Sequence, residues 1–319
     1  MQTPMRLTAA LSFALALTTG SFVAGASAEP KPFSLCVVHN LADHPSIAAI
    51  VNGMNDEAPL FGAKITYFDP AFDPQKQVAM IEDCIARKAD VIAVNAVDPA
   101  AVVPALKKAY DAHIPIIMHN ADTNDAGRVY SKTYVGVKSY DQGYEVAKQL
   151  SKDYAGKPVS IVVLSGKPGQ TDALNREAGM RAAFADAKAN VKVLGSEPAD
   201  WSKDKGMTVM QDMLTRFPKI DALFSQDDGM AMGALQAMKA ADRTDIKIYS
   251  VGAMKEACSA IKNKDQFVAT AMQPSYLIGV YTVRAAYDAL HGRLLPKETL
   301  TPTAAITADN EAQWESQCW

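Results

Sequence analysis

The sequence has little excess charge and no long hydrophobic run near its N-terminus. Its 319 residues carry 32 basic and 35 acidic side chains, a net charge of −3, and the basic residues form no block. A mildly acidic chain of this kind is a poor partner for nucleic acid or for an anionic membrane surface. The apolar stretch from Leu7 to about Leu17 is shorter than the ~20 residues that a membrane-spanning helix needs.

Signatures of catalysis are also missing. The sequence contains no Gly-x-Ser-x-Gly nucleophile motif and no His-Glu-x-x-His metal motif. Residues 166–171 have the composition of a phosphate-binding loop but lack its Gly-Lys-Ser/Thr ending, which indicates an ordinary turn between a strand and a helix. The five histidines show no paired ligand spacing on one helix face. We therefore expect no enzyme, no metal site and no cofactor.

The first 28 residues are typical of a signal peptide. Arg6 is their only charged residue, the apolar stretch follows it, and residues 26–28 (Ala-Ser-Ala) fit a small-residue cleavage site. No cysteine follows the cleavage point, so nothing indicates a lipid anchor there. Removing 28 of the 319 residues would leave an exported protein of 291 residues. That length exceeds the usual single-domain size, so we expect two lobes.

Four cysteines lie beyond the signal peptide, at positions 36, 84, 258 and 318. An exported protein permits two disulfides, and four cysteines allow three pairings. In a sheet of strand order 2-1-3, the right-handed crossover from the second strand passes over the first. This places Cys84, late in the second helix, near Cys36 in the first strand, and leaves Cys258 and Cys318 as the second pair. Four buried free thiols are the alternative.

Strand and helix patterns alternate along almost the whole chain. Apolar runs typical of buried strands cover residues 33–39, 63–68, 90–96, 114–119, 133–137, 159–165, 191–195, 220–225, 246–251 and 267–272. Helical patterns cover residues 46–60, 74–88, 99–111, 140–154, 172–188, 203–216, 229–241, 254–263 and 275–291.

Such alternation predicts an α/β fold of two doubly wound parallel-sheet lobes, joined by a hinge of several crossing segments. We expect one lobe to comprise residues 29–137 with about 274–296, and the other residues 138–273 with about 297–319. Closure about the crossing segments is a common way to enclose a ligand.

Polar and aromatic side chains follow many of the predicted strands. In an open parallel sheet, ligands bind in the crevice at the carboxyl ends of the strands. We therefore predict a ligand site from Asn40, Asp43, His44, Asn120, Asp122, Arg176, Trp201, Asp227 and Gln273. Arg, Asn and Asp groups suit vicinal hydroxyls, and an indole suits the C–H face of a sugar or polyol.

The pair Asp227 and Asp228 stands in the most informative of these turns, between an apolar run and a helical pattern. One carboxylate can cap the helix, which leaves the other for a ligand. We expect Asp227 to contact the ligand and Asp228 to cap the helix. The alternative is that both only cap and solvate the turn.

The chain resembles the ribose-type periplasmic binding proteins, the substrate-binding components of ABC sugar importers, over residues 33–300. The similarity is strongest in residues 198–201 (Pro-Ala-Asp-Trp), 205–211 and 222–235 (Ala-Leu-Phe-Ser-Gln-Asp-Asp-Gly-Met-Ala-Met-Gly-Ala-Leu). Weaker matches are residues 43–47, 176–179 and 269–273. The resemblance implies that Arg176 binds ligand hydroxyls, that Trp201 replaces a stacking Phe, that Asp227 replaces an Asn, and that Gln273 is retained.

The first lobe departs from the family pattern. Ser46 and Ile47 stand where the family has an aromatic pair, and His44 replaces an Asn. An Asp-Arg pair becomes Asn120-Ala121, and residues 250–252 (Ser-Val-Gly) replace Gly-Phe-Asp. A pentose-sized or smaller sugar or a short polyol suits this thinner wall better than a pyranose held between aromatic rings.

The resemblance implies a monomeric periplasmic binding protein that passes a neutral sugar or polyol to an inner-membrane ABC permease. A chemoreceptor partner or a signalling binder with an autoinducer-type ligand is the alternative on the same fold. An exported hydrolase is a weaker alternative, because it needs a nucleophile–base pair or a metal site.

Overall fold

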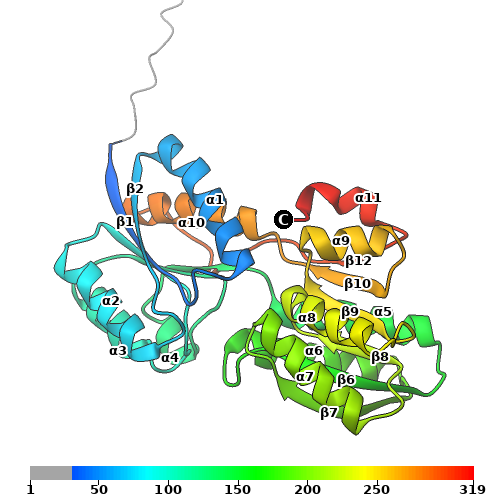
Figure 1. Ribbon diagram of the computed structural model, residues 1–319. Helices are drawn as coiled ribbons and strands as arrows, with labels where there is room; N and C mark the ends of the chain where they lie inside the picture. The colour runs from blue at the N-terminus through cyan, green and yellow to red at the C-terminus, as the bar shows by residue number, and fades with distance from the viewer. Residues whose placement is uncertain (1–30) are drawn as a thin grey trace, which may run out of the picture.

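The computed structural model describes residues 31–319 and shows two α/β lobes side by side (Figure 1). Each lobe contains a six-stranded sheet with helices on both faces. The predicted fold class is confirmed. The predicted signal peptide lies outside the described residues.

The sheet of the first lobe is parallel throughout, with strand order β11-β5-β4-β3-β1-β2. Its strands are β1 (Phe33–Val38), β2 (Ala63–Phe68), β3 (Val91–Val94), β4 (Ile116–His119), β5 (Thr133–Gly136) and β11 (Glu298–Leu300). Its helices are α1 (Pro45–Phe61), α2 (Pro74–Ala86), α3 (Val103–Asp111), α4 (Asp125–Arg128) and α10 (Ser275–Leu290).

The sheet of the second lobe has the order β12-β10-β9-β8-β6-β7, and only β12 is antiparallel to its neighbour. Its strands are β6 (Val159–Ser165), β7 (Val191–Pro198), β8 (Ala222–Ser225), β9 (Lys247–Gly252), β10 (Phe267–Met272) and β12 (Ala305–Thr307). Its helices are α5 (Ser139–Tyr154), α6 (Thr171–Asp186), α7 (Lys203–Arg216), α8 (Asp228–Ala240), α9 (Lys255–Lys262), α11 (Glu311–Trp314) and the 3₁₀ helix η1 (Glu315–Gln317).

Burial explains why the inner strands are largely apolar rather than alternating. Every residue of β3, β4, β5 and β8 is buried. In β1, Leu35 and Val37 pack into a core on one face of the sheet, while Cys36 and Val38 pack into a core on the other. Successive side chains of a strand point to opposite faces. The inner strands of a sheet covered on both faces therefore carry mostly apolar residues on both faces.

The chain crosses between the two sheets three times. The crossings lie between β5 and α5, between β10 and α10, and between β11 and β12. The predicted last boundary near residue 297 is too early, because β11 (residues 298–300) still pairs with β5 of the first sheet. This short strand, Glu-Thr-Leu, has no apolar run by which the sequence could reveal it.

Both predicted disulfides are present. Cys36 pairs with Cys84, with their Cα atoms 6.0 Å apart. Cys258 pairs with Cys318, with their Cα atoms 6.5 Å apart. The second bond ties the segment after α11 to helix α9.

No helix within residues 31–319 is both long enough and apolar enough to cross a membrane.

Candidate ligand-binding cleft

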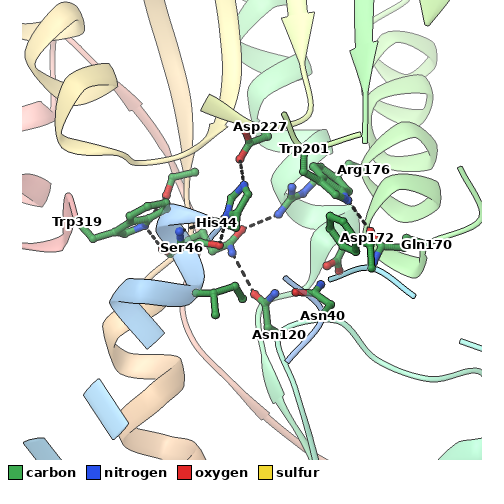
Figure 2. Close-up of a pocket in the computed structure, with 14 residues that line it drawn as sticks. Asn40, His44, Ser46, Asn120, Gln170, Asp172, Arg176, Trp201, Asp227 and Trp319 are labelled. Carbon is green, nitrogen blue, oxygen red and sulfur yellow. Dashed lines mark hydrogen bonds and ion pairs between the residues drawn. The ribbon is translucent and has the colours of Figure 1, made fainter. Parts of the chain in front are cut away.

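A cavity lies between the two lobes, where the carboxyl ends of strands from both sheets meet (Figure 2). Polar groups and aromatic rings make up most of its wall. The lining residues are Asn40, His44, Ser46, Ile47, Phe72, Asn120, Gln170, Asp172, Arg176, Trp201, Asp227, Gly252, Gln273 and Trp319. Its volume is about 40 Å³, far below the roughly 300–1,000 Å³ of pockets for drug-sized ligands. The cavity therefore suits a small ligand.

The first turn of α1 and the turn after β4 build the wall of the first lobe. His44 is the N-cap of α1, and its Nδ1 lies 2.7 Å from the hydroxyl of Ser46 and 3.3 Å from the Ser46 amide. This fixes the imidazole with Nε2 facing the second lobe. Asn120 takes a left-handed backbone conformation (φ 59°), which asparagine tolerates better than most residues.

Arg176 organises the wall of the second lobe. It is buried, and its guanidinium donates hydrogen bonds to the Gln226 carbonyl (2.6 Å), to Gln273 Oε1 (2.6 Å) and twice to Gln142 Oε1 (2.9 and 3.1 Å). It also lies 5.4 Å from the centre of the Trp201 ring. Four of its five N–H donors are thus bound to protein. Arg176 positions Gln273 and Trp201 and keeps one donor for a ligand.

The two adjacent aspartates have different partners from those expected. Asp227 is the N-cap of α8, because its backbone is extended and its Oδ1 accepts a hydrogen bond from the Met230 amide at 3.0 Å. Asp228 is buried beneath the cavity, where its carboxylate accepts hydrogen bonds from the Met254 amide (2.9 Å), from Thr270 (2.8 Å) and from Ser250. The prediction that Asp228 caps the helix is wrong: Asp227 both caps it and lines the cavity.

The two carboxyls also differ in their pKa values. Burial tends to raise the pKa of Asp227, but His44, the Met230 amide and Arg176 together outweigh burial and hold it below its ordinary value. Burial raises the pKa of Asp228 to about 6, against the hydrogen bonds from Ser250 and Met254. Asp227 is therefore the carboxylate that offers a charged acceptor to the cavity.

Direct contacts across the cleft hold the lobes together around the cavity. His44 Nε2 lies 3.5 Å from Asp227 Oδ2 (Figure 2). Gln273 Nε2 donates to Asn120 Oδ1 at 3.1 Å, and Lys167 Nζ donates to the Phe72 carbonyl at 3.3 Å. The structure therefore shows the two lobes closed on one another.

The two-lobed fold is shared with known proteins. A family model described as a periplasmic binding protein domain matches residues 36–294. This chain belongs to the periplasmic binding protein family.

Individual members of the family span nearly the full length of the chain. The chain is 30% identical over 277 residues to the ribose import binding protein RbsB of Bacillus subtilis, covering 86% of this chain and 88% of that protein. It is 31% identical over 288 residues to RbsB of Escherichia coli, covering 90% and 94%. Among solved structures, the Caulobacter myo-inositol binding protein superimposes with a TM-score of 0.82 at 25% identity, covering 88% of this chain and 95% of that one.

Seven of the nine predicted site residues of this periplasmic binding protein line the cavity: Asn40, His44, Asn120, Arg176, Trp201, Asp227 and Gln273. The other two do not. Asp43, which directly precedes the N-cap of α1, is exposed and does not line the cavity. Asp122 is buried in an ion pair with Arg128 (2.7 Å). Arg128 belongs to α4, a four-residue helix that the sequence did not predict.

The predicted site omitted five residues with polar or aromatic side chains on the wall: Ser46, described above, and Phe72, Gln170, Asp172 and Trp319. Gln170 and Asp172 stand at the start of α6, where Asp172 accepts a hydrogen bond from the Ser139 hydroxyl at 2.6 Å. Burial raises the pKa of Asp172. Phe72 comes from the loop after β2, and Trp319 from the segment after η1. Neither aromatic residue directly follows a parallel strand, so the rule that found the other site residues did not include them. For Trp319 the sequence did offer one signal, because the predicted Cys258–Cys318 bond ties the neighbouring residue to the second lobe.

Within residues 31–319, no three or more His, Cys, Asp or Glu side chains are grouped so as to hold a metal ion.

Proposed function

We propose that this protein is the substrate-binding component of an ABC importer and binds a small neutral sugar or polyol between its lobes. The observation that carries the proposal is the cavity itself, in which hydrogen-bonding groups of both lobes surround an indole ring. The family relationship supports the same role. We infer that it acts in the periplasm as a monomer, without catalysis, and passes its ligand to an inner-membrane permease.

The charges around the cavity favour a neutral ligand. Asp227 and Asp172 line the wall, and their carboxyls accept hydrogen bonds from hydroxyls. Four of the five N–H groups of Arg176 donate to protein groups, so only one remains to bind and neutralise an anion. An anionic ligand would be repelled by the carboxylates, and the remaining N–H donor of Arg176 would not fully offset that repulsion.

The shape of the cavity favours a single small ring or a short chain. Its volume is about 40 Å³, and Trp201 offers a flat face for the C–H groups of a sugar. Ser46 and Ile47 leave the start of α1 without an aromatic ring at the wall, while Phe72 supplies one from the neighbouring loop after β2. These features support a ligand of pentose size or smaller.

A ligand panel tests the proposal. We expect D-ribose, L-arabinose, xylitol or a similarly small neutral compound to raise the melting temperature, since a ligand that binds only the folded state stabilises it. Gluconate, a polyhydroxylated anion, should have no effect. Stabilisation by gluconate alone, or by hexopyranoses and not by pentoses or polyols, would reject the proposed ligand class.

Asp227→Ala tests the site. We expect it to weaken binding of the best panel ligand by roughly 2 kcal/mol, about 30-fold in Kd, because ligand hydroxyls and His44 lose a buried acceptor. Asp43→Ala is the matched control, since Asp43 lies nearby on the same cleft edge but is exposed and outside the cavity. Isothermal titration calorimetry should give the control variant the wild-type affinity. Equal affinities for all three proteins would show that the ligand binds elsewhere.

A further inference from the structure

We propose that Trp319 is a specificity-determining residue: its indole closes one end of the ligand cavity, and the Cys258–Cys318 disulfide holds it there. The inference rests on the proposed function, because it concerns which ligands the same cavity admits.

Trp319 separates the cavity from a much larger recess. The recess has a volume of about 740 Å³ and lies between the start of α1, the start of α10 and the segments 254–256 and 316–319. Trp319 is the one residue of the described chain that lines both spaces. Figure 2 shows it opposite Trp201, across the polar side chains of the cavity. Without the indole, the small cavity would open into the recess.

The indole is held rigidly. Its Nε1 donates to the carbonyl oxygens of Gly252 (2.9 Å) and Gln273 (2.7 Å), which end or follow β9 and β10. The Trp319 backbone amide donates to the Ala253 carbonyl (3.1 Å), and its own carbonyl accepts from the Lys255 amide (2.8 Å). The adjacent Cys318 is bonded to Cys258 in α9. A wall fixed at so many points can reject a ligand rather than move aside for it.

The chemistry of this wall indicates what it excludes. The indole nitrogen is satisfied by protein, so the ring offers the cavity only apolar surface. An unsubstituted sugar or polyol would fit with one end in contact with the indole, whereas a ligand with an added O-methyl or glycosyl group at the Trp319 end of the cavity would collide with the ring. Excluding or admitting one such group in a pocket changes affinity by roughly 10- to 200-fold. We infer that Trp319 restricts the site to unsubstituted monomeric ligands.

The test compares how well each protein binds parent compounds and their O-methyl derivatives. The probes are D-ribose, L-arabinose, xylitol and myo-inositol, each with its O-methyl derivatives, measured by calorimetry on wild type, Trp319→Ala and Trp319→Phe. We expect Trp319→Ala to improve the affinity for a methyl derivative relative to its parent by about tenfold or more. The ratio of the two affinities, derivative to parent, is the quantity to compare between proteins. Trp319→Phe should keep the wild-type ratio, because phenylalanine retains an aromatic wall and loses only the N–H anchor.

The two disulfides provide a matched pair of controls. The double variant Cys258→Ser with Cys318→Ser should shift the ratio in the same direction as Trp319→Ala, since it frees the segment that carries the wall. Cys36→Ser with Cys84→Ser should leave the ratio unchanged, because neither residue lines the cavity or the recess. An unchanged ratio in Trp319→Ala, or an equal loss of affinity for parents and derivatives, would show that Trp319 is only a structural anchor and would overturn the inference.

A crystal structure of Trp319→Ala separates this inference from the proposed function. If none of the probes binds the wild-type protein, the proposed function fails, and the crystal structure still tests the wall. We expect the cavity and the recess to merge into one space. A cavity that stays closed in Trp319→Ala would overturn the inference whatever the ligand is.

Discussion

Single residues in this protein owe their roles to position rather than to type. Asp227 and Asp228 are neighbours in the chain, yet the carboxylate of Asp227 faces the cleft and that of Asp228 is buried against β9 and β10. The residue with extended backbone caps α8, and the next residue already lies in the helix. The sequence predicts that the turn holds two carboxylates at the cleft. The prediction that Asp228 caps the helix is wrong, because the identity of the cap depends on where the helix begins to within one residue.

His39 and His119 form a buried pair and directly precede Asn40 and Asn120, which line the cavity. Their rings lie 5.7 Å apart, His39 also stacks on Tyr67 at 5.5 Å, and neither ring makes a hydrogen bond within the described part of the chain. Burial lowers the pKa of His39 to about 4, against the opposing charge of Asp69. Burial and His39 place the pKa of His119 well below its ordinary value. Both imidazoles are therefore neutral in the folded protein at pH 7.

The pair should make the folded state sensitive to acid. The unfolded chain binds protons at these histidines below pH 6.5, whereas folded His39 resists protonation down to about pH 4. The free energy of unfolding should thus fall as the pH drops from about 6.5 to 4, with His39 contributing up to about 3 kcal/mol. His39→Phe keeps the ring and removes the titration.

Urea unfolding at several pH values checks this prediction. The raised pKa values of Asp122 and Asp228 act in the opposite direction in this range, so the difference between wild type and His39→Phe is the quantity to follow. We expect wild type to lose stability relative to the variant as the pH falls. Parallel curves for the two proteins would contradict the account of His39.

At the scale of elements, close helix pairs cover the sheets. Helices α7 and α8 cross where Gly206 and Gly233 face the partner backbone. A Cβ atom added at Gly233 would lie 1.9 Å from the Lys203 carbonyl oxygen. Glycines also face a neighbouring helix backbone where α1 crosses α10 and where α5 crosses α6. These crossings fix the helices whose first turns carry site residues.

Gly233→Ala should therefore destabilise the protein. The added methyl group meets backbone atoms rather than a flexible side chain, so the helices must separate, and we expect a loss of about 2 kcal/mol or more in the free energy of unfolding. Thr208→Ala, on the exposed face of α7, is the control and should change stability by less than about 0.5 kcal/mol. Equal midpoints of denaturation for the two variants would contradict the tight crossing.

The Cys36–Cys84 bond ties β1 to α2 across 48 residues of sequence. Replacing both cysteines by alanine should lower the free energy of unfolding by about 4 kcal/mol in the chain-entropy model. Ligand affinity should stay near the wild-type value, because the bond is outside the cavity. Denaturation and calorimetry on the same preparation check both statements, and a large loss of affinity in the folded variant would contradict the second.

Elements with a long apolar or periodic pattern are predictable from this sequence, and short ones are not. The ten predicted strands correspond to β1 to β10 within a few residues. The missed elements, α4, β11, β12, α11 and η1, have three or four residues each, too few to show a period. The two strands among them are defined by pairing with β5 and β10 rather than by a local pattern. Seven site residues were predictable because strand ends converge in a parallel sheet. Phe72 and Trp319 were not, because long-range packing brings them to the cleft.

The whole molecule consists of two lobes joined by three crossing segments, with the candidate site between the lobes. Groups of both lobes line the cavity, and contacts such as His44–Asp227 and Gln273–Asn120 join the lobes across it. We expect a ligand to enter when these contacts open and to gain hydrogen bonds from both walls when they close again. Binding and closure should therefore be one coupled event.

Small-angle X-ray scattering during a ligand titration tests this coupling most directly. The protein is first unfolded and refolded to remove any co-purified ligand, then titrated with the panel compound that stabilises it most. We predict that the radius of gyration falls and saturates at the ligand concentration given by the calorimetric Kd, and that Asp227→Ala needs about 30-fold more ligand for the same change. Saturated binding with an unchanged radius of gyration would contradict a site that closes between the lobes.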